Sequence, residues 1–224
     1  ELLATCKDGR ARLRAYLDDY AFLIDAVLSV LSCRWSGRWL EFAVQLADAL
    51  LRDFAHADGG FFFTSEQHER LIQRRRDFMD DALPSGNGVA AAALIQLGHL
   101  LGEKRYLDAA ERTVRAAWDS LERIPHAHNA LLLALIRLID PPQQVILRGQ
   151  GRELEDWSAQ CKRLLNLRTA WYGIPKEEMA LPGMLSERSA QERATAYVCE
   201  GFQCGAPIRD IGELARALKA AKPE

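Results

Sequence analysis

A polar turn at residues 80–88 carries the side chains best suited to chemistry. Asp80 and Asp81 could each supply a carboxylate for general acid or base catalysis, although adjacent side chains point in different directions. Ser85 and Asn87 precede an apolar stretch, residues 89–101, that predicts a helix. These side chains could instead cap that helix or brace the loop, because the first N–H groups of a helix have no intrahelical partner. We predict Asp80 and Asp81 as catalytic residues and Ser85 and Asn87 as substrate-binding residues.

Two histidines precede another predicted helix, at residues 129–139. His126 and His128 flank Ala127, so in an extended segment they would share a face. A neutral imidazole is suited to proton transfer, which makes His128 a catalytic candidate and His126 a binding candidate. A capping or solvated histidine is the alternative. No third and fourth ligand can be identified beside this pair, so the sequence predicts no metal and no cofactor.

Aromatic and acidic residues near the first helix could complete a binding site. Asp19 and Tyr20 begin an apolar stretch that extends to Cys33, and Phe62 is the middle residue of Phe61-Phe62-Phe63. Tyr20 and Phe62 could stack against a ligand ring, and Asp19 could bind a polar group or simply cap the helix. Because exposure alternates along a strand, at least one of the three phenylalanines is expected in the core.

Cysteine usage gives a further candidate. Cys199 and Cys204 lie at the end of a predicted strand and could form a redox pair if the segment is a hairpin; a structural or incidental pair is the alternative. The five cysteines form an odd, widely spaced set, which favours reduced thiols and a cytoplasmic location.

Composition narrows the possible partners. The 224 residues are 49% hydrophobic, enough for a substantial core, and the net charge of −2 gives no electrostatic case for nucleic acid or an anionic membrane. The most apolar run, residues 130–136, is too short to span a bilayer. Because the chain begins with Glu1, we expect a fragment or a processed product.

The apolar pattern repeats along the first part of the chain. An apolar helix over 20–33 is followed by an amphipathic helix over 38–54, and the same order recurs at 89–101 and 105–121. The helix at 129–139 would be a third inner helix. Such hairpins bury their sides only against neighbouring hairpins, which favours part of an α/α toroid over an ordinary helical bundle.

Loop lengths indicate where a site would lie. The long connection at residues 56–83, which includes a predicted turn and short strand at 58–64, adjoins the starts of the inner helices, whereas the opposite end has only tight turns. After residue 142 the pattern becomes a small α/β lobe, with strands near 145–147, 169–172 and 194–199. The predicted fold is therefore mainly α, with a toroid segment at 1–142 and an α/β lobe at 143–224.

Four motifs, taken in order, carry a family resemblance. They are Asp18-Asp19-Tyr20-Ala21-Phe22-Leu23-Ile24-Asp25, Asp58-Gly59-Gly60-Phe61-Phe62-Phe63-Thr64, Asp80-Asp81-Ala82-Leu83-Pro84-Ser85-Gly86-Asn87, and Ala196-Tyr197-Val198-Cys199 with Cys204. The chain resembles the C-terminal third of the thioredoxin-domain-containing proteins related to spermatogenesis-associated protein. That resemblance implies an N-terminal thioredoxin-like domain followed by a six-hairpin α/α toroid, similar to N-acylglucosamine 2-epimerases and six-hairpin glycosidases.

The chain departs from the full family pattern in two ways. It contains no Cys-x-x-Cys motif, and it has fewer than six hairpins, so it would supply only part of a toroid. The resemblance implies a carbohydrate ligand and an epimerase-like or glycosidase-like activity, for which His128 would move a proton next to a carbonyl. A non-catalytic scaffold or a protein- or glycan-binding module is the alternative. Expected partners are the thioredoxin-like part of the same protein and a second copy of the chain.

Overall fold

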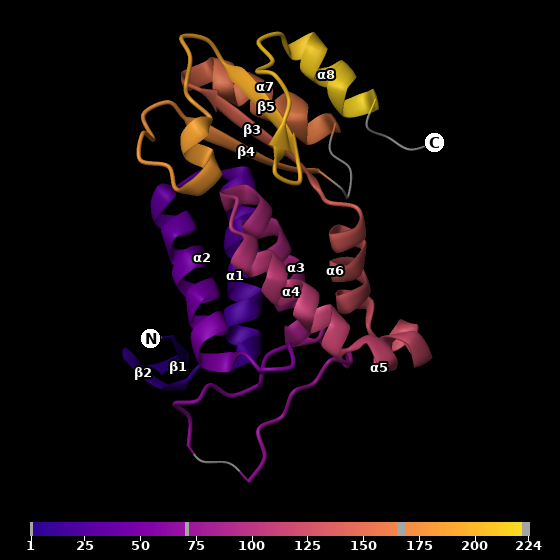
Figure 1. Ribbon diagram of the computed structural model, residues 1–224. Helices are drawn as coiled ribbons and strands as arrows, with labels where there is room; N and C mark the ends of the chain where they lie inside the picture. Colours follow the sequence, from indigo (N-terminus) through magenta and orange to yellow (C-terminus); the bar gives the residue numbers. More distant parts are fainter. Residues whose placement is uncertain (1, 70–71, 165–168, 221–224) are drawn as a thin grey trace. The chain divides into compact units, whose positions relative to one another are not determined.

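A computed structural model describes residues 2–69, 72–164 and 169–220 (Figure 1). The chain divides into two compact units, each made of segments that are separate in sequence. The helical unit comprises Glu1–Leu28, Leu40–Gly98 and Lys104–Asp140. The α/β unit comprises Ser29–Trp39, His99–Glu103 and Pro141–Glu224. The predicted mainly α class is confirmed, while a division of the chain at residue 142 stays a prediction.

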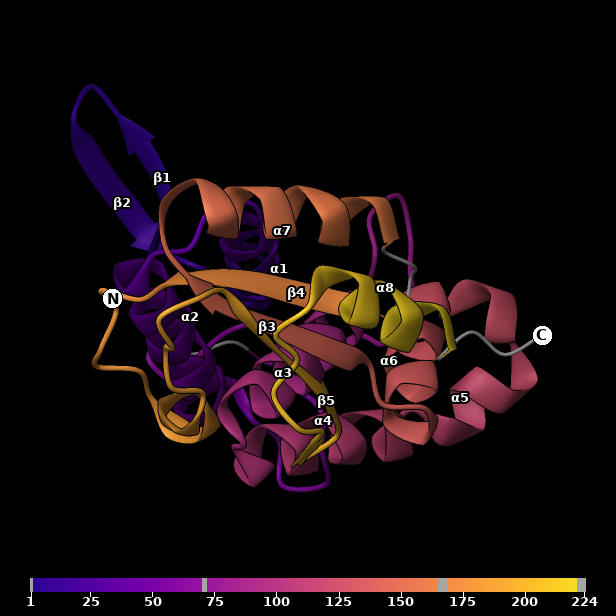
Figure 2. The same cartoon turned by 90° about the horizontal axis from the view of Figure 1, so that it is seen from above.

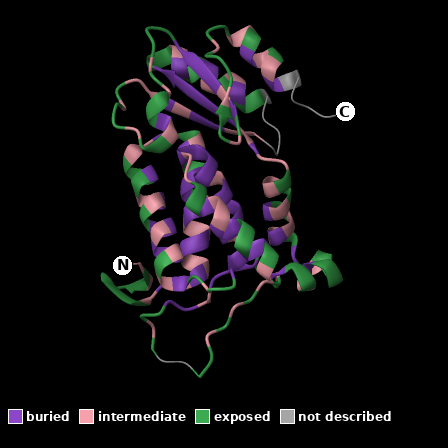
Figure 3. Cartoon of the chain, viewed as in Figure 1, coloured by how far each residue is buried: buried purple, intermediate pink, exposed green. Residues whose placement is uncertain are grey.

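The three predicted inner stretches form helices, namely α1 (Leu17–Cys33), α3 (Gly86–Leu101) and α6 (Asn129–Ile139). In α3 every residue is buried except Val89 and Gln96, which are half-buried (Figure 3). An apolar sequence all round a helix explains this burial, because such a helix has no face suited to water. α6 differs, since Leu133, Ile136 and Ile139 on one side of it are exposed.

The amphipathic stretches also form helices. α2 (Gly37–Ala49) continues into a π-helical turn, η1 (Leu50–Phe54), and the second stretch forms α4 (Lys104–Ala116) and α5 (Trp118–Arg123). The single helix expected over 105–121 is therefore interrupted at Ala117. The N–H of Ala117 is shared between the carbonyls of Thr113 and Val114, at 3.3 and 3.2 Å, so the regular hydrogen-bond ladder ends there.

Helices α3 and α6 approach each other at a glycine. A Cβ added to Gly88 would lie 2.5 Å from Ala130 Cβ and 2.9 Å from Leu131 N. The spacing of these two helices therefore depends on a residue without a side chain.

Two local elements differ from the sequence prediction. Residues 3–14 form an antiparallel hairpin of β1 (Leu3–Lys7) and β2 (Arg10–Arg14), which the sequence analysis does not predict. Of the turn and short strand predicted at 58–64, the structure has the turn, and in place of the strand it has an isolated bridge between Ala55 and Phe61. Gly59 and Gly60 both have positive φ, 98° and 72°, which glycine adopts at little cost in such a turn.

The α/β unit is built on a four-stranded sheet with the order β4-β3-β5-β6. β3 (Gln143–Gly149) and β4 (Thr169–Pro175) are parallel and are joined through α7 (Gly151–Leu164), whereas β5 (Thr195–Glu200) is antiparallel to β3. β6 (Gln203–Cys204) forms the edge, a short helical turn η3 (Gly183–Glu187) lies in the loop before β5, and α8 (Ile211–Ala220) follows β6.

Helices α7 and α8 cover one face of this sheet (Figure 2). The core between them contains Val145, Leu147, Trp157, Cys161, Trp171, Ala196, Leu214 and Leu218. Burial raises the pKa of the Cys161 thiol to about 11, so this cysteine stays protonated and unreactive at neutral pH. Among the helices at residues 2–69, 72–164 and 169–220, none has the length and apolarity needed to cross a membrane.

We predict that Gly88→Ala destabilises the helical unit. A Cβ at this position requires a shift of the α6 backbone, and overpacking of this kind costs about 1–3 kcal/mol, against a gain of about 1 kcal/mol in helix propensity. A lower midpoint in urea unfolding, with an unchanged slope, is the expected result.

The matched control is Gly212→Ala in α8. There the atoms nearest to a Cβ are Asp210 Oδ1 at 3.1 Å, which accepts the Glu213 N–H, and Arg216 Nη1 at 4.0 Å. No backbone atom has to move, so the change in midpoint should be much smaller than for Gly88→Ala. Equal unfolding midpoints for wild type and Gly88→Ala would show that α3 and α6 are not held at the spacing described.

Candidate functional site

The first turns of α1, α3 and α6 lie together in the helical unit. Leu17 and Asp18 of α1 are next to Gly86 of α3, and Ala130 and Leu131 of α6 are next to Gly88. The sequence predicted candidate residues at the starts of all three helices, and the structure brings these starts to one place.

Asn87 attaches the long connection before α3 to this end of the unit. Its side chain is fully buried; Oδ1 accepts a hydrogen bond from the Phe61 N–H at 2.7 Å, and Nδ2 donates to the carbonyls of Phe61 and Asp77, both at 2.9 Å. The amide of Asn87 is therefore occupied by backbone groups and does not face a ligand.

Asp80 and Ser85 also bind the backbone. Asp80 Oδ1 accepts from the Ser85 N–H at 2.8 Å, and Oδ2 accepts from the Ala130 N–H at 3.1 Å, so one carboxylate braces the starts of both α3 and α6. Ser85 Oγ accepts from the Gly88 N–H at 3.4 Å and donates to the Asp77 carbonyl at 3.3 Å. Ser85 thus occupies the capping position of α3.

His128 is fully buried, with both ring nitrogens engaged. Nδ1–H donates to the Ile124 carbonyl at 2.8 Å, and Nε2 then accepts from the Ser120 hydroxyl at 3.1 Å. This is the environment of a structural histidine. His126 is exposed in the turn η2 (Pro125–Ala127), where its carbonyl accepts from Asn129 Nδ2 at 3.1 Å.

Asp19 and Phe62 likewise have local partners. Asp19 Oδ2 accepts from the Tyr16 N–H at 2.8 Å, immediately before α1. The Phe62 ring lies 4.0 Å below the guanidinium of Arg74 and 5.0 Å from the ring of His56. Both contacts stabilise the connection that precedes α3.

A cavity of about 340 Å³ lies beside the starts of α1 and α3 and is called here the aspartate pocket. Its polar lining includes Asp18, Arg75, Asp77, Asp81 and Ser85, and its apolar lining includes Leu17, Phe63, Met79, Leu83 and Pro84. Arg75 pairs with Asp77 at 2.7 Å, and Asp81 is exposed. Of the predicted residues, Asp81 and Ser85 therefore line this pocket.

Asp18 is the acid of this pocket whose ionisation is disturbed. Burial raises its pKa above the ordinary 3.8, and the nearby carboxylates of Asp19 and Asp77 raise it further. The close approach depends on Gly86, because a Cβ there would overlap Asp18 Oδ1. A carboxyl with a raised pKa in a pocket is a candidate proton donor.

The sequence prediction did not include Asp18 or Asp77. Asp18 adjoins the predicted binding residue Asp19, and Asp77 follows a run of three arginines at 74–76. The available signal was their position along the chain. Asp18 lies at the start of the first predicted inner helix, and Asp77 lies in the long connection before the second.

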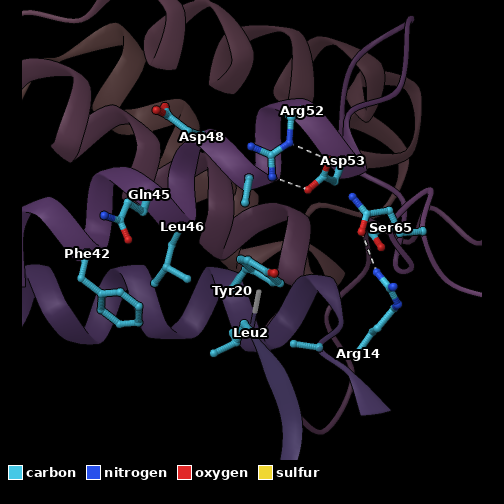
Figure 4. A pocket seen from close by; sticks show the side chains of 13 residues that line it. Leu2, Arg14, Tyr20, Phe42, Gln45, Leu46, Asp48, Arg52, Asp53 and Ser65 are labelled. Atoms are coloured by element: carbon cyan, nitrogen blue, oxygen red, sulfur yellow. Dashed lines mark hydrogen bonds and ion pairs between the residues drawn. The ribbon is translucent and has the colours of Figure 1, made fainter. Parts of the chain in front are cut away.

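A second cavity, of about 460 Å³, is lined by residues of α1, α2, η1 and the segments beside them, and is called here the tyrosine pocket (Figure 4). Tyr20 lines it, is 7% exposed and packs against Phe54 with ring centroids 5.1 Å apart. The polar lining is paired: Arg52 binds Asp53 through hydrogen bonds of 2.8 and 2.7 Å, and Arg14 Nη1 donates to Gln67 Oε1 at 2.6 Å.

Cys199 and Cys204 form a disulfide across the β5–β6 hairpin of the α/β unit. The expectation of five reduced thiols is wrong for this pair, because the hairpin places the two residues directly opposite each other. Cys6, Cys33 and Cys161 are free. Among the side chains that the structure describes, no three His, Cys, Asp or Glu residues are grouped so that they could hold a metal ion.

Fold and pocket together define a mainly α protein with an acidic pocket at the starts of its helices. Spermatogenesis-associated protein 20 of Homo sapiens is 30% identical over 213 residues, which cover 91% of this chain and 27% of the human protein. The Rattus norvegicus protein of the same name gives the same values, and an uncharacterised protein of Caenorhabditis elegans is 27% identical over 212 residues. No protein-family model matches the chain.

This similarity supports the family relation expected from the motifs. The chain spans 27% of the length of the human and rat relatives, so it corresponds to a part of those proteins.

We predict that Asp18→Asn raises stability at pH 7. The raised folded-state pKa means that Asp18 favours folding below pH 3.8, and this contribution is lost as the pH rises through the raised value. The amide removes the buried charge, so the midpoint of thermal unfolding should increase at pH 7 and the gain should shrink towards pH 3.

The control is Asp156→Asn, an exposed aspartate of α7, which should change the midpoint little at either pH. A lower midpoint for Asp18→Asn at pH 7 would show that the ionised carboxylate stabilises the fold.

Proposed function

We propose that the helical unit is part of an α/α toroid whose rim binds a carbohydrate, with Asp18 and Asp81 as the ligand-contacting carboxylates. The observation that carries this proposal is the half-buried Asp18 carboxyl with its raised pKa, in a pocket that the exposed Asp81 also lines. A protonated carboxyl can donate a hydrogen bond to a ligand oxygen, whereas an ionised one accepts from a hydroxyl.

The pocket has the composition expected of a site for a small polar ligand. A few polar groups converge on it, and Phe63, Leu83 and Pro84 supply an apolar wall for a sugar ring. A carboxyl whose pKa is raised, beside further carboxylates, is also the arrangement used for acid–base chemistry on sugars, which supports an epimerase-like or glycosidase-like activity.

The proposed roles differ from the sequence prediction. His128 and Asp80 are assigned structural roles here, because each of their polar side-chain atoms binds a group of the protein itself. Asp18 takes the place of His128 as the group that exchanges a proton, and Asp81 keeps its predicted role.

A second candidate function is a non-catalytic scaffold attached to a redox domain. It is favoured by the use of Asp80, Ser85, Asn87 and His128 to hold backbone groups at the site where a catalytic set was expected. Exposed apolar side chains on α6 and Trp118, beside a groove of about 750 Å³, support contact with further parts of a longer protein, such as a thioredoxin-like part. A second copy of the chain could cover the same surface.

The test is a thermal-shift screen against free sugars, amino sugars and oligosaccharides, with folding of each variant checked by circular dichroism. A ligand that binds only the folded state stabilises it by about 2.7 kcal/mol at 100 times its Kd. We expect a bound sugar to raise the midpoint of wild type and of Asp156→Asn, and to have a much smaller effect on Asp18→Asn and Asp81→Asn.

A sugar that shifts all four proteins equally would place its site elsewhere. If no sugar shifts the folded wild-type protein, the carbohydrate proposal fails and the scaffold is the better account.

A further inference from the structure

The β5–β6 hairpin of the α/β unit carries a disulfide that fastens only its tip. Cys199 pairs with Cys204 and Glu200 pairs with Gln203 in the antiparallel register, so the turn between the cysteines is four residues long. Gly201 has φ of 58°, which a tight turn requires and which glycine adopts at little cost. A disulfide that closes so short a loop restricts the unfolded chain much less than one that joins distant segments.

Other interactions hold the strands beyond the tip. The Gly205 N–H donates to the Val198 carbonyl at 2.9 Å, and Ala196 and Ile208 exchange two hydrogen bonds of 2.9 Å. Ile208 and Val198 also pack against the core of the α/β unit. The segment after β6 would therefore stay beside β5 if the disulfide were opened.

The two cysteines differ in exposure. Cys199 is 6% exposed, whereas Cys204 lies on the edge strand β6 and is half-buried. An external thiol can thus approach Cys204 more easily than Cys199.

The turn lies on a buried histidine. The ring of Phe202 is 5.7 Å from the ring of His99, and a ring N–H of His99 hydrogen-bonds to the backbone of Gly201. His99 is 9% exposed, and its Nδ1 is buried with no hydrogen-bond partner among the described residues. A buried nitrogen without a hydrogen-bond partner costs free energy. The closed turn keeps Nδ1 of His99 in this state, and a water molecule that reached it would supply the missing partner.

We propose that Cys199 and Cys204 form a reversible dithiol–disulfide site that is reduced by an external dithiol, with the surrounding fold kept in both states. A thiolate of the dithiol attacks Sγ of Cys204, the bond between the cysteines breaks, and Cys199 leaves as a thiolate that takes up a proton. The second thiol of the dithiol then attacks the mixed disulfide and releases Cys204. Two electrons and two protons reach the pair, and the dithiol becomes a disulfide.

Reduction removes the covalent tie at the end of the turn above His99. The turn is then held by the Glu200–Gln203 pair and the contact of Phe202, so water should reach the imidazole more often. Exchange of the His99 ring C–H with deuterated solvent is a readout that a purely structural disulfide would not change without unfolding.

The first experiment equilibrates the whole protein with mixtures of reduced and oxidised dithiothreitol, followed by alkylation and mass spectrometry. We expect Cys199 and Cys204 to change together between protected and alkylated forms, following a two-electron curve that is the same in both directions. Circular dichroism should stay native throughout. Cys6 and Cys33, which are exposed, should be alkylated in every mixture, and buried Cys161 in none. Exchange at His99 should be faster in the reduced protein.

Loss of native circular dichroism together with reduction would overturn the proposal, because the disulfide would then be needed for the fold. Alkylation of both cysteines in fully oxidising mixtures would also overturn it, since no disulfide would exist.

A pair of single variants tests the order of attack in a background of Cys6→Ser and Cys33→Ser. With Cys199→Ser the remaining Cys204 should react with a chromogenic aromatic disulfide at least several-fold faster than Cys199 does in Cys204→Ser. Equal or reversed rates would overturn the assignment of Cys204 as the attacked sulfur.

Discussion

The buried side chain of Asn87 is the interaction on which the arrangement of the helical unit depends. Two of its three hydrogen bonds satisfy the backbone N–H and carbonyl of Phe61, which a neighbouring strand would otherwise satisfy. The third binds the carbonyl of Asp77. A long connection between helices has many unsatisfied backbone groups, and a single amide in the first turn of α3 satisfies several of them. Phe63, Asp77 and Asp81, which line the aspartate pocket, all lie on the connection that Asn87 attaches.

The same end of the unit shows how structural and ligand-binding needs compete for polar side chains. Three helices begin there, and the free N–H groups of their first turns attract the nearest acceptors. Asp80 and Ser85 are used in this way, and Asp19 accepts from the backbone just before α1. Asp18 and Asp81 line the aspartate pocket instead of capping a helix, and they are therefore the proposed ligand-contacting residues.

The sequence predicted the helices well and the roles of single polar residues poorly. The apolar patterns over 20–33, 38–54 and 129–139 each predict a helix, and a helix is present at each place. Over 129–139 the pattern does not report burial, because apolar side chains on one side of α6 are exposed. Asp18 and Asp19 lie about 100° apart around the helix axis, and only Asp18 faces Gly86. The apolar periodicity does not indicate which of the two positions faces this glycine. A prediction of the disulfide would have needed the pairing register of β6, a strand of two residues, and turn residues alone do not specify that register.

The shortness of β6 also bears on the solubility of the folded chain. An uncovered sheet edge is a template for pairing with another molecule, and β5 would present a long one if nothing lay beside it. A strand of two residues, followed by Gly205 and by Pro207 with no N–H to donate, leaves little backbone for a second chain to join. The hairpin that carries the cysteines therefore also guards this edge of the sheet against edge-to-edge aggregation.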